Sequence, residues 1–174
     1  MNGRIPRRCL PVILAIALNG CVDFVFDQAT IRGSGTIAEE TYEFAGVADV
    51  QLSTLGELEI RLGAREELRI ETDDNLLSPF EAEHVGDRVR IRSRRGARLR
   101  PSETVHFTLT VRALESIRLS SSGNAHAPAL SADHFEIDIS SSGDLSMERI
   151  EADALEVSIS SSGNVTVGDG VVED

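Results

Sequence analysis

The 174-residue sequence has no lysine and no tryptophan, and its aromatic residues are limited to six phenylalanines and one tyrosine. So few aromatic rings leave little material for a platform on which bases or sugars stack. All 17 basic residues are arginines, and 29 acidic residues outnumber them to give a formal net charge of -12. Because an acidic surface repels phosphate backbones, this charge argues against nucleic-acid binding.

Cysteine is almost as scarce, and both copies, Cys9 and Cys21, lie near the N-terminus. A disulfide framework is therefore not expected. What the sequence does have is 41% hydrophobic and 26% charged residues, a composition typical of a folded globular protein. Its length fits one domain with a sizeable core, and no linker-like stretch divides it.

Residues 1–20 predict a secretory signal peptide. They contain no acid, and three arginines precede an apolar run at residues 10–18, which is shorter than the about 20 residues that span a bilayer. The sequence Leu18-Asn19-Gly20-Cys21 resembles a bacterial lipobox, whose cysteine is acylated and becomes the new N-terminus. We expect lipidation at Cys21 and a tether over residues 21–30. An ordinary signal peptide with an incidental cysteine is the alternative.

A repeat of 20 residues dominates the C-terminal third. The sequence Ser-Ser-Ser-Gly-Asn at residues 120–124 recurs at 160–164, and as Ser-Ser-Ser-Gly-Asp at 140–144. Between the turns, apolar and polar residues alternate, which predicts strands with one buried face. Because such short strands bury little surface alone, they are expected to stack as a solenoid. Each repeat then forms one coil of a single-stranded parallel β-helix.

The repeated turn predicts two columns of aligned residues. We expect its glycines to have positive φ, so that the chain changes direction at the same place in each coil; they are Gly123, Gly143 and Gly163. The residues that follow would stack about 4.8 Å apart, with side-chain amides donating hydrogen bonds to a central carboxylate. These are Asn124, Asp144 and Asn164.

Residues 31–113 are less regular but also contain alternating segments. Gly33-Ser34-Gly35-Thr36 resembles a degenerate copy of the turn. The stretch Asp73-Asp74-Asn75-Leu76-Leu77 is typical of a strand end followed by a turn or short helix. With coils of about 20 residues, residues 31–174 would form about seven coils.

The serine-glycine turns, Gly33-Ser34-Gly35, the stretch 73–76 and the lipobox together resemble the auto-transporter adhesin, head GIN domain family. The resemblance covers residues 31–174 and implies a right-handed, pectin-lyase-like β-helix without that superfamily's catalytic residues. It also implies an exported, often lipid-anchored bacterial protein with a suspected adhesive role. Where relatives usually have a first glycine in the turn, this sequence has Ser121, Ser141 and Ser161.

Serine and histidine are plentiful, yet their pattern does not favour a hydrolase. The serine runs recur identically, whereas a nucleophile needs one activated environment, and no Gly-x-Ser-x-Gly elbow is present. The histidines lack the spacing of transition-metal ligands; they are His84, His106, His126 and His134. We therefore expect no catalytic residue, no cofactor and no metal site.

Two alternatives use the acidic residues. Outward acids on adjacent coils resemble the clustered carboxylates of polysaccharide lyases and hydrolases, although a solvated face is the simpler interpretation; they are Glu136, Asp138 and Glu156. The turns also offer oxygen ligands to calcium, but the Gly-Gly-x-Gly-x-Asp spacing of calcium-binding β-rolls is missing.

Seven arginines fall within residues 88–100 of an otherwise acidic chain. Alternation places Val89 and Ile91 inward and the arginines outward. Since guanidinium groups bind carboxylate and phosphate through paired hydrogen bonds, this arginine strip is a candidate site for an anionic glycan, a lipid headgroup or an acidic partner. A charged edge that prevents aggregation is the alternative. The strip consists of Arg88, Arg90, Arg92, Arg94, Arg95, Arg98 and Arg100.

These patterns favour a non-enzymatic lipoprotein of the bacterial cell envelope, held on a membrane at its periplasmic or outer face. It would bind an envelope polysaccharide or a protein partner as an adhesion module. The alternatives are a carbohydrate-active enzyme of pectin-lyase type and a structural protein that assembles through its coil ends. The last coil is expected either to present an open edge or to be capped by charged residues at 168–170 and 173–174.

Overall fold

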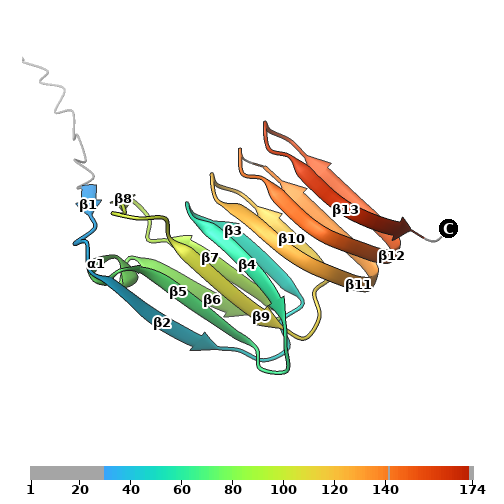
Figure 1. Ribbon diagram of the computed structural model, residues 1–174, viewed down its shortest axis with the longest axis horizontal. Helices are drawn as coiled ribbons and strands as arrows, with labels where there is room; N and C mark the ends of the chain where they lie inside the picture. Colours follow the sequence, from blue (N-terminus) through green and yellow to red (C-terminus); the bar gives the residue numbers. More distant parts are fainter. Residues whose placement is uncertain (1–29, 141, 173–174) are drawn as a thin grey trace, which may run out of the picture.

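The computed structural model describes residues 30–140 and 142–172, which contain thirteen strands and one short helix, α1 (Asp74–Leu77). Eleven of the strands form one mixed sheet that coils around a common core, while β1 (Thr30–Arg32) and β8 (Arg98–Arg100) pair separately at one end (Figure 1). The predicted all-β class is confirmed. In the described ranges, no helix is long and apolar enough to cross a membrane. The predicted signal peptide and Cys21 lie outside these ranges.

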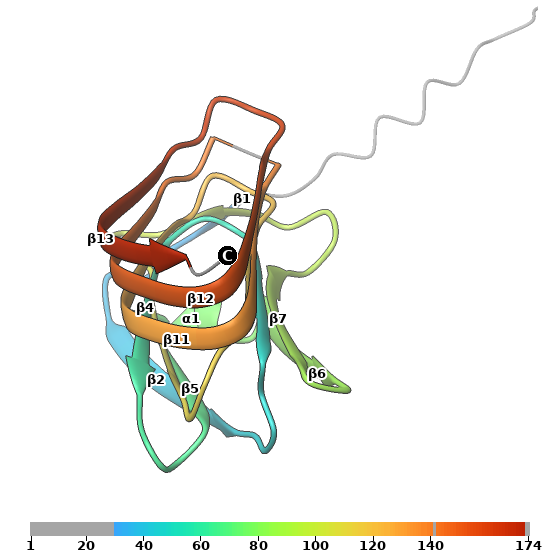
Figure 2. The ribbon, with the colours of Figure 1, turned by 90° about the vertical axis from the view of Figure 1, so that its right-hand side faces the viewer.

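The copies of the 20-residue repeat stack on one another in parallel. β11 (Asn124–Ile139) and β12 (Leu145–Ile159) each extend through most of a repeat, and their paired residues are offset by 20, as in Leu130 with Ile150. β13 (Val165–Val172) continues the stack over the first half of β12. Figure 2, which looks onto the C-terminal end, shows the copies following the same path.

The layer below the first repeat comes from a distant part of the chain. β10 (Ser116–Leu119) pairs in parallel with β3 (Asp49–Ser53), and β11 pairs in parallel with β4 (Glu57–Leu62). On their other side, β3 and β4 pair with β7 (Arg88–Ser93) and β9 (His106–Val111). Residues 49–62 therefore lie between residues 88–111 and the repeats, so the layers do not follow chain order.

Antiparallel pairs occur only in the N-terminal half of the described chain. β5 (Glu67–Asp73) pairs in this way with β2 (Ile37–Glu43) and with β9, and β6 (Phe80–Val85) pairs with β7. A single-stranded parallel β-helix over all of residues 31–174 therefore does not hold for this half. One reason is local: only Gly86 and Asp87 connect β6 to β7, and so short a connection reverses the chain into a hairpin.

Inward-facing apolar residues of all layers form one core. Val89, Val50, Ile117 and Ile137 occupy one row across the strands and are fully buried. In the last layer this row is uncovered. Val157, the counterpart of Ile137, has 46% of its surface exposed.

The turn glycines have a different role from the predicted one. Gly123 and Gly143 do not have positive φ, so that expectation is wrong at these two positions. A Cβ on Gly123 would lie 2.5 Å from the carbonyl oxygen of Thr54, and one on Gly143 would collide with the carbonyl oxygen of Gly123. Glycine is needed because each turn packs its backbone directly on the turn below.

A fourth copy of the turn is Ser53-Thr54-Leu55-Gly56, at the end of β3. The hydroxyls of Ser53 and Ser120 lie 2.7 Å apart, and the offset between them is 67 residues. A search at a period of 20 does not find this copy, although Leu-Ser-Thr-Leu-Gly resembles Leu-Ser-Ser-Ser-Gly. The copy expected at residues 33–36 does not belong to the column of turns.

Instead, the loop at residues 33–36 meets the other N-terminal motif. The buried carboxylate of Asp73 accepts hydrogen bonds from the backbone N–H of Gly35 (2.7 Å) and of Ser102 (2.9 Å). The Ser102 hydroxyl donates a third bond at 2.6 Å, and these bonds lower the pKa of Asp73. Ser34 N–H also donates to Asn75 Oδ1. We call this cluster the Asp73 clasp.

Candidate functional site

A groove of about 780 Å³ crosses the outer face of β9, β4, β11, β12 and β13. Because these strands are parallel and in register, their outward side chains form rows that run from strand to strand. We call this feature the ladder groove. Its first row is His106, Glu57, Asn124, Asp144 and Asn164, and its second row is Thr108, Glu59, His126, Ser146 and Thr166.

Hydrogen bonds within the first row hold the turn residues in a stack. The Asp144 N–H donates to Asn124 Oδ1 at 3.1 Å, and the Asn164 N–H donates to Asp144 Oδ1 at 3.0 Å. The Asn164 side-chain amide donates to the same Asp144 oxygen at 2.8 Å. All three side chains remain exposed on the groove side, where they can also contact a ligand.

Carboxylates give the ladder groove its charge. Glu57, Glu59 and Asp144 line it, and no arginine is among its lining residues. Glu57 lies 3.8 Å from the imidazole of His106. Arg61, just outside the groove, donates two hydrogen bonds of 2.9 Å to Glu59 and lowers the pKa of that carboxyl.

The groove has no exposed aromatic ring other than its histidines. Phe107, the lining residue with a benzene ring, is fully buried. The remaining histidines lie elsewhere: the ring of His84 is 5.3 Å from that of Phe44, and His134 is exposed outside the groove. Within the described ranges, no group of three or more His, Cys, Asp or Glu side chains is placed to hold a metal ion.

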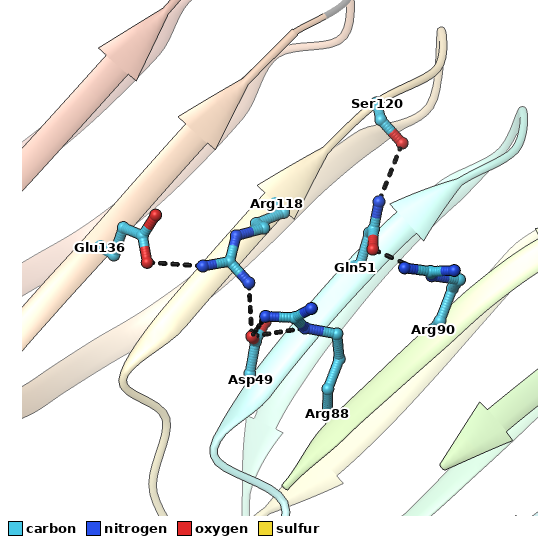
Figure 3. A network of polar contacts seen from close by, with 7 residues as sticks. All are labelled: Asp49, Gln51, Arg88, Arg90, Arg118, Ser120 and Glu136. Atoms are coloured by element: carbon cyan, nitrogen blue, oxygen red, sulfur yellow. Dashed lines mark hydrogen bonds and ion pairs between the residues drawn. The ribbon is translucent and has the colours of Figure 1, made fainter. Parts of the chain in front are cut away.

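A second polar cluster covers the face formed by β7, β3, β10 and β11 (Figure 3). Asp49 lies at its centre, with one oxygen 2.6 Å from both Arg88 and Arg118. Arg118 also contacts Glu136 at 2.6 Å, and Gln51 accepts a hydrogen bond from Arg90 at 3.0 Å. Glu136 is thus held in an ion-pair network rather than in a groove.

The arginine strip divides into two parts. Val89 and Ile91 are fully buried, as the alternation predicts. On β7, Arg88 contacts Asp49, and Arg92 lies 2.7 Å from Glu81 and 2.6 Å from Glu83. The remaining members are exposed in or near the loop that leads to β8, and they are Arg94, Arg95, Arg98 and Arg100.

The ladder groove combines residues that the sequence offers only as separate candidates. Asn124, Asp144 and Asn164 are visible as a repeat column. Glu57 and His106 join the same row only because β4 and β9 pair beside β11. No period or motif links these segments in the sequence.

Solved structures with a similar fold come from bacteria. One described as a putative adhesin from Parabacteroides merdae has a TM-score of 0.72 and 15% identity, covering 81% of this chain and 60% of that chain. A putative adhesin from Bacteroides fragilis has a TM-score of 0.65 and 16% identity, with coverages of 78% and 63%. For a putative lipid binding protein from Parabacteroides distasonis, these values are 0.55, 15%, 74% and 63%.

At these identities the similarity shows the fold, and this chain spans about 60% of the length of the Parabacteroides merdae protein. No curated protein matches the sequence. The family model described as "Putative auto-transporter adhesin, head GIN domain" matches residues 47–174, a range that includes every strand of the ladder groove. The resemblance drawn from the motifs is confirmed: the chain belongs to the auto-transporter adhesin, head GIN domain family.

Proposed function

We propose that this protein is a non-enzymatic binding module of the bacterial cell envelope, exported and anchored through lipidated Cys21, and that its ladder groove binds a polysaccharide. The observation that carries the proposal is the pair of in-register polar rows across five parallel strands. Membership in a family named for adhesins supports export and surface binding.

The geometry of the rows suits an extended polymer. Neighbouring strands lie about 4.8 Å apart, which is close to the advance of one pyranose unit along an extended β-linked glycan. A glycan lying along the groove therefore places successive sugars over successive strands. Each sugar then meets one amide, carboxylate or imidazole of the first row and one group of the second row.

The lining also limits the charge and affinity of the ligand. Three carboxylates without an arginine favour a neutral or amine-bearing glycan over an acidic one. Because no benzene or indole ring is exposed there, contacts are mainly hydrogen bonds, each worth about 1 kcal/mol net. Single-site binding is therefore weak, and display of many anchored copies on one membrane supplies avidity.

The state of Glu59 favours binding over catalysis. A glycosidase acid needs a raised pKa to hold its proton near neutral pH. The two hydrogen bonds from Arg61 instead lower the pKa of Glu59 and keep it ionised. The outward acids first considered for a lyase lie on the other face, where Glu136 is paired with Arg118.

A glycan array tests the proposal. The groove variant His126→Ala/Ser146→Ala/Thr166→Ala removes three exposed polar groups, none of which supports a turn. We expect it to lose about ten-fold or more in affinity for every glycan that the wild type binds. The control Asp138→Ala/Ser158→Ala alters the opposite face and should bind normally. Absence of glycan binding by the wild type, or equal binding by the groove variant, contradicts the proposal.

The exposed end of the core favours a second candidate, a structural protein that assembles through its ends. Val157 and Ile159 have 46% and 45% of their surfaces exposed on the last layer. Assembly predicts a concentration-dependent oligomer in analytical ultracentrifugation, reduced to monomer by Val157→Ser/Ile159→Ser. A monomeric wild type at all concentrations rejects this candidate.

A further inference from the structure

Five exposed arginines gather at the end of the molecule where β1 and β8 pair. The register aligns Thr30 with Arg98 and Arg32 with Arg100, so Arg32 joins the strip although it lies far away in the sequence. Arg94 and Arg95 precede β8 in the same loop. We call this cluster the end patch, and its members are Arg32, Arg94, Arg95, Arg98 and Arg100.

The end patch is basic although the protein is acidic. The exposed acids of the adjoining segments are Asp74 and Glu103, and Arg94 lies 3.6 Å from Glu81, which also contacts Arg92. From residue 101 onward the sequence has three arginines and 13 acids. Since the repeats form the other end of the stack (Figure 1), charge changes from basic to acidic along its long axis.

The chain enters the fold at this same end. β1 begins at Thr30, only nine residues after Cys21. Nine residues span at most about 30 Å when fully extended. Figure 1 shows β1, β8 and α1 at the end opposite the C-terminus. An acylated Cys21 therefore confines the end patch to the neighbourhood of the bilayer.

We propose that the end patch binds anionic phospholipid headgroups and sets the orientation of the protein on its membrane. The inference rests on the lipid anchor of the proposed function. Guanidinium groups form paired hydrogen bonds with phosphate, and each arginine near an anionic surface strengthens binding about five-fold. The tether makes this contact intramolecular, so that weak attraction is sufficient.

This orientation has consequences for the ladder groove. With the end patch on the membrane, the stack projects outward, and its acidic repeats lie away from the negative surface. The groove runs along the stack from β9 to β13, so its length faces the surrounding envelope rather than the bilayer. Anchoring and ligand binding thus use separate surfaces.

Vesicle flotation tests the headgroup contact without the acyl chains. The full chain with Cys21→Ser is mixed with vesicles of phosphatidylcholine, or of phosphatidylcholine and phosphatidylglycerol in equal amounts. We expect stronger binding to the anionic vesicles, decreasing with added salt. Replacing four patch arginines should weaken that binding roughly a hundred-fold or more; the substitutions are Arg94→Ser, Arg95→Ser, Arg98→Ser and Arg100→Ser.

A matched variant controls for net charge. It replaces four exposed arginines outside the end patch and should bind anionic vesicles like the Cys21→Ser parent; the substitutions are Arg61→Ser, Arg65→Ser, Arg69→Ser and Arg112→Ser. Equal losses in both variants show that only net charge matters, and equal binding to both kinds of vesicle shows no headgroup recognition. Either result overturns the proposal.

Orientation is measured on the lipidated protein in anionic vesicles. A fluorophore on Ala97→Cys, in the loop of the end patch, should be quenched by headgroup-labelled lipid, whereas one on Thr166→Cys should not. Equal quenching at both positions overturns the proposal. Failure of the proposed function gives different signs: an unacylated Cys21 by mass spectrometry, or no glycan binding, with the vesicle result unchanged.

Discussion

The two halves of the molecule reach the same layered core by different means. In residues 116–172, one set of contacts recurs every 20 residues, and each layer is a translated copy of the layer below. In residues 30–111, each layer is joined by its own contacts, such as the Asp73 clasp. A repeated sequence specifies its own register, whereas a unique sequence needs individual long-range contacts to specify one.

Buried polar residues follow this division. The acid Glu66, on the turn before β5, is buried and accepts a hydrogen bond from the backbone N–H of Gly46. Every buried polar or charged side chain identified in the described ranges lies between residues 49 and 116, and none lies in the repeats that follow. Since such groups are costly unless they are paired, each one restricts the alternative packings of its region.

The largest expected effect compares two copies of one core position. Ile137→Ala removes a fully buried side chain and should destabilise the protein by about 2–5 kcal/mol. Val157→Ala changes the equivalent site of the last layer, which is already 46% exposed, and should cost less than about 1 kcal/mol. Urea unfolding measures both. Similar losses would mean that the last layer is covered in solution.

The second prediction separates the two reasons for glycine. Gly143 is crowded by the turn below without positive φ, whereas Gly46 has φ of 73° and no atom within 4 Å of the place that a Cβ would occupy. Asparagine tolerates positive φ but still carries a Cβ. Gly46→Asn should therefore be nearly neutral, and Gly143→Asn should cost about 1–3 kcal/mol or more. Thermal melts of both variants decide, and equal costs would contradict the distinction.

Asp49 joins the two halves, because its carboxylate bridges Arg88 on β7 and Arg118 on β10. Asp49→Asn should destabilise the protein by about 1–2 kcal/mol, a value reduced by the partial exposure of both arginines. Asp138→Asn, on the same outer face, is the matched control and should change stability by less than about 0.5 kcal/mol. An equal effect of both substitutions in chemical unfolding would reject the bridging role.

The smallest effect concerns acid sensitivity of the N-terminal half. Hydrogen bonds from Ser102 lower the pKa of Asp73, so the folded state holds its proton less tightly than the unfolded state. This stabilisation is present above the unfolded pKa of about 3.9 and is lost as pH falls through the lower folded pKa. Asp73→Asn should lower the melting temperature by a few degrees at neutral pH. The difference from wild type should shrink below about pH 4, and a constant difference would contradict the ionic role.

Half of the candidate site was accessible to sequence reasoning. Asn124, Asp144 and Asn164 form a visible column because each repeat contributes one residue at the same position. Glu57 and His106 were not, since they enter the groove through pairings between segments about 50 and 67 residues apart. The partners of the arginine strip were inaccessible for the same reason: Asp49 meets Arg88 only across the β3–β7 register.

The sequence by itself determined the strand-rich class, the family, and the parallel stacking of the repeats, because alternation and a constant 20-residue period act locally and between neighbours. Only the tertiary structure decided the rest. It inserted residues 49–62 between later segments, and it made the N-terminal half mixed. It also placed Arg32 beside Arg100. These features depend on long-range pairing, which is decided by the burial of the whole core rather than by any local pattern.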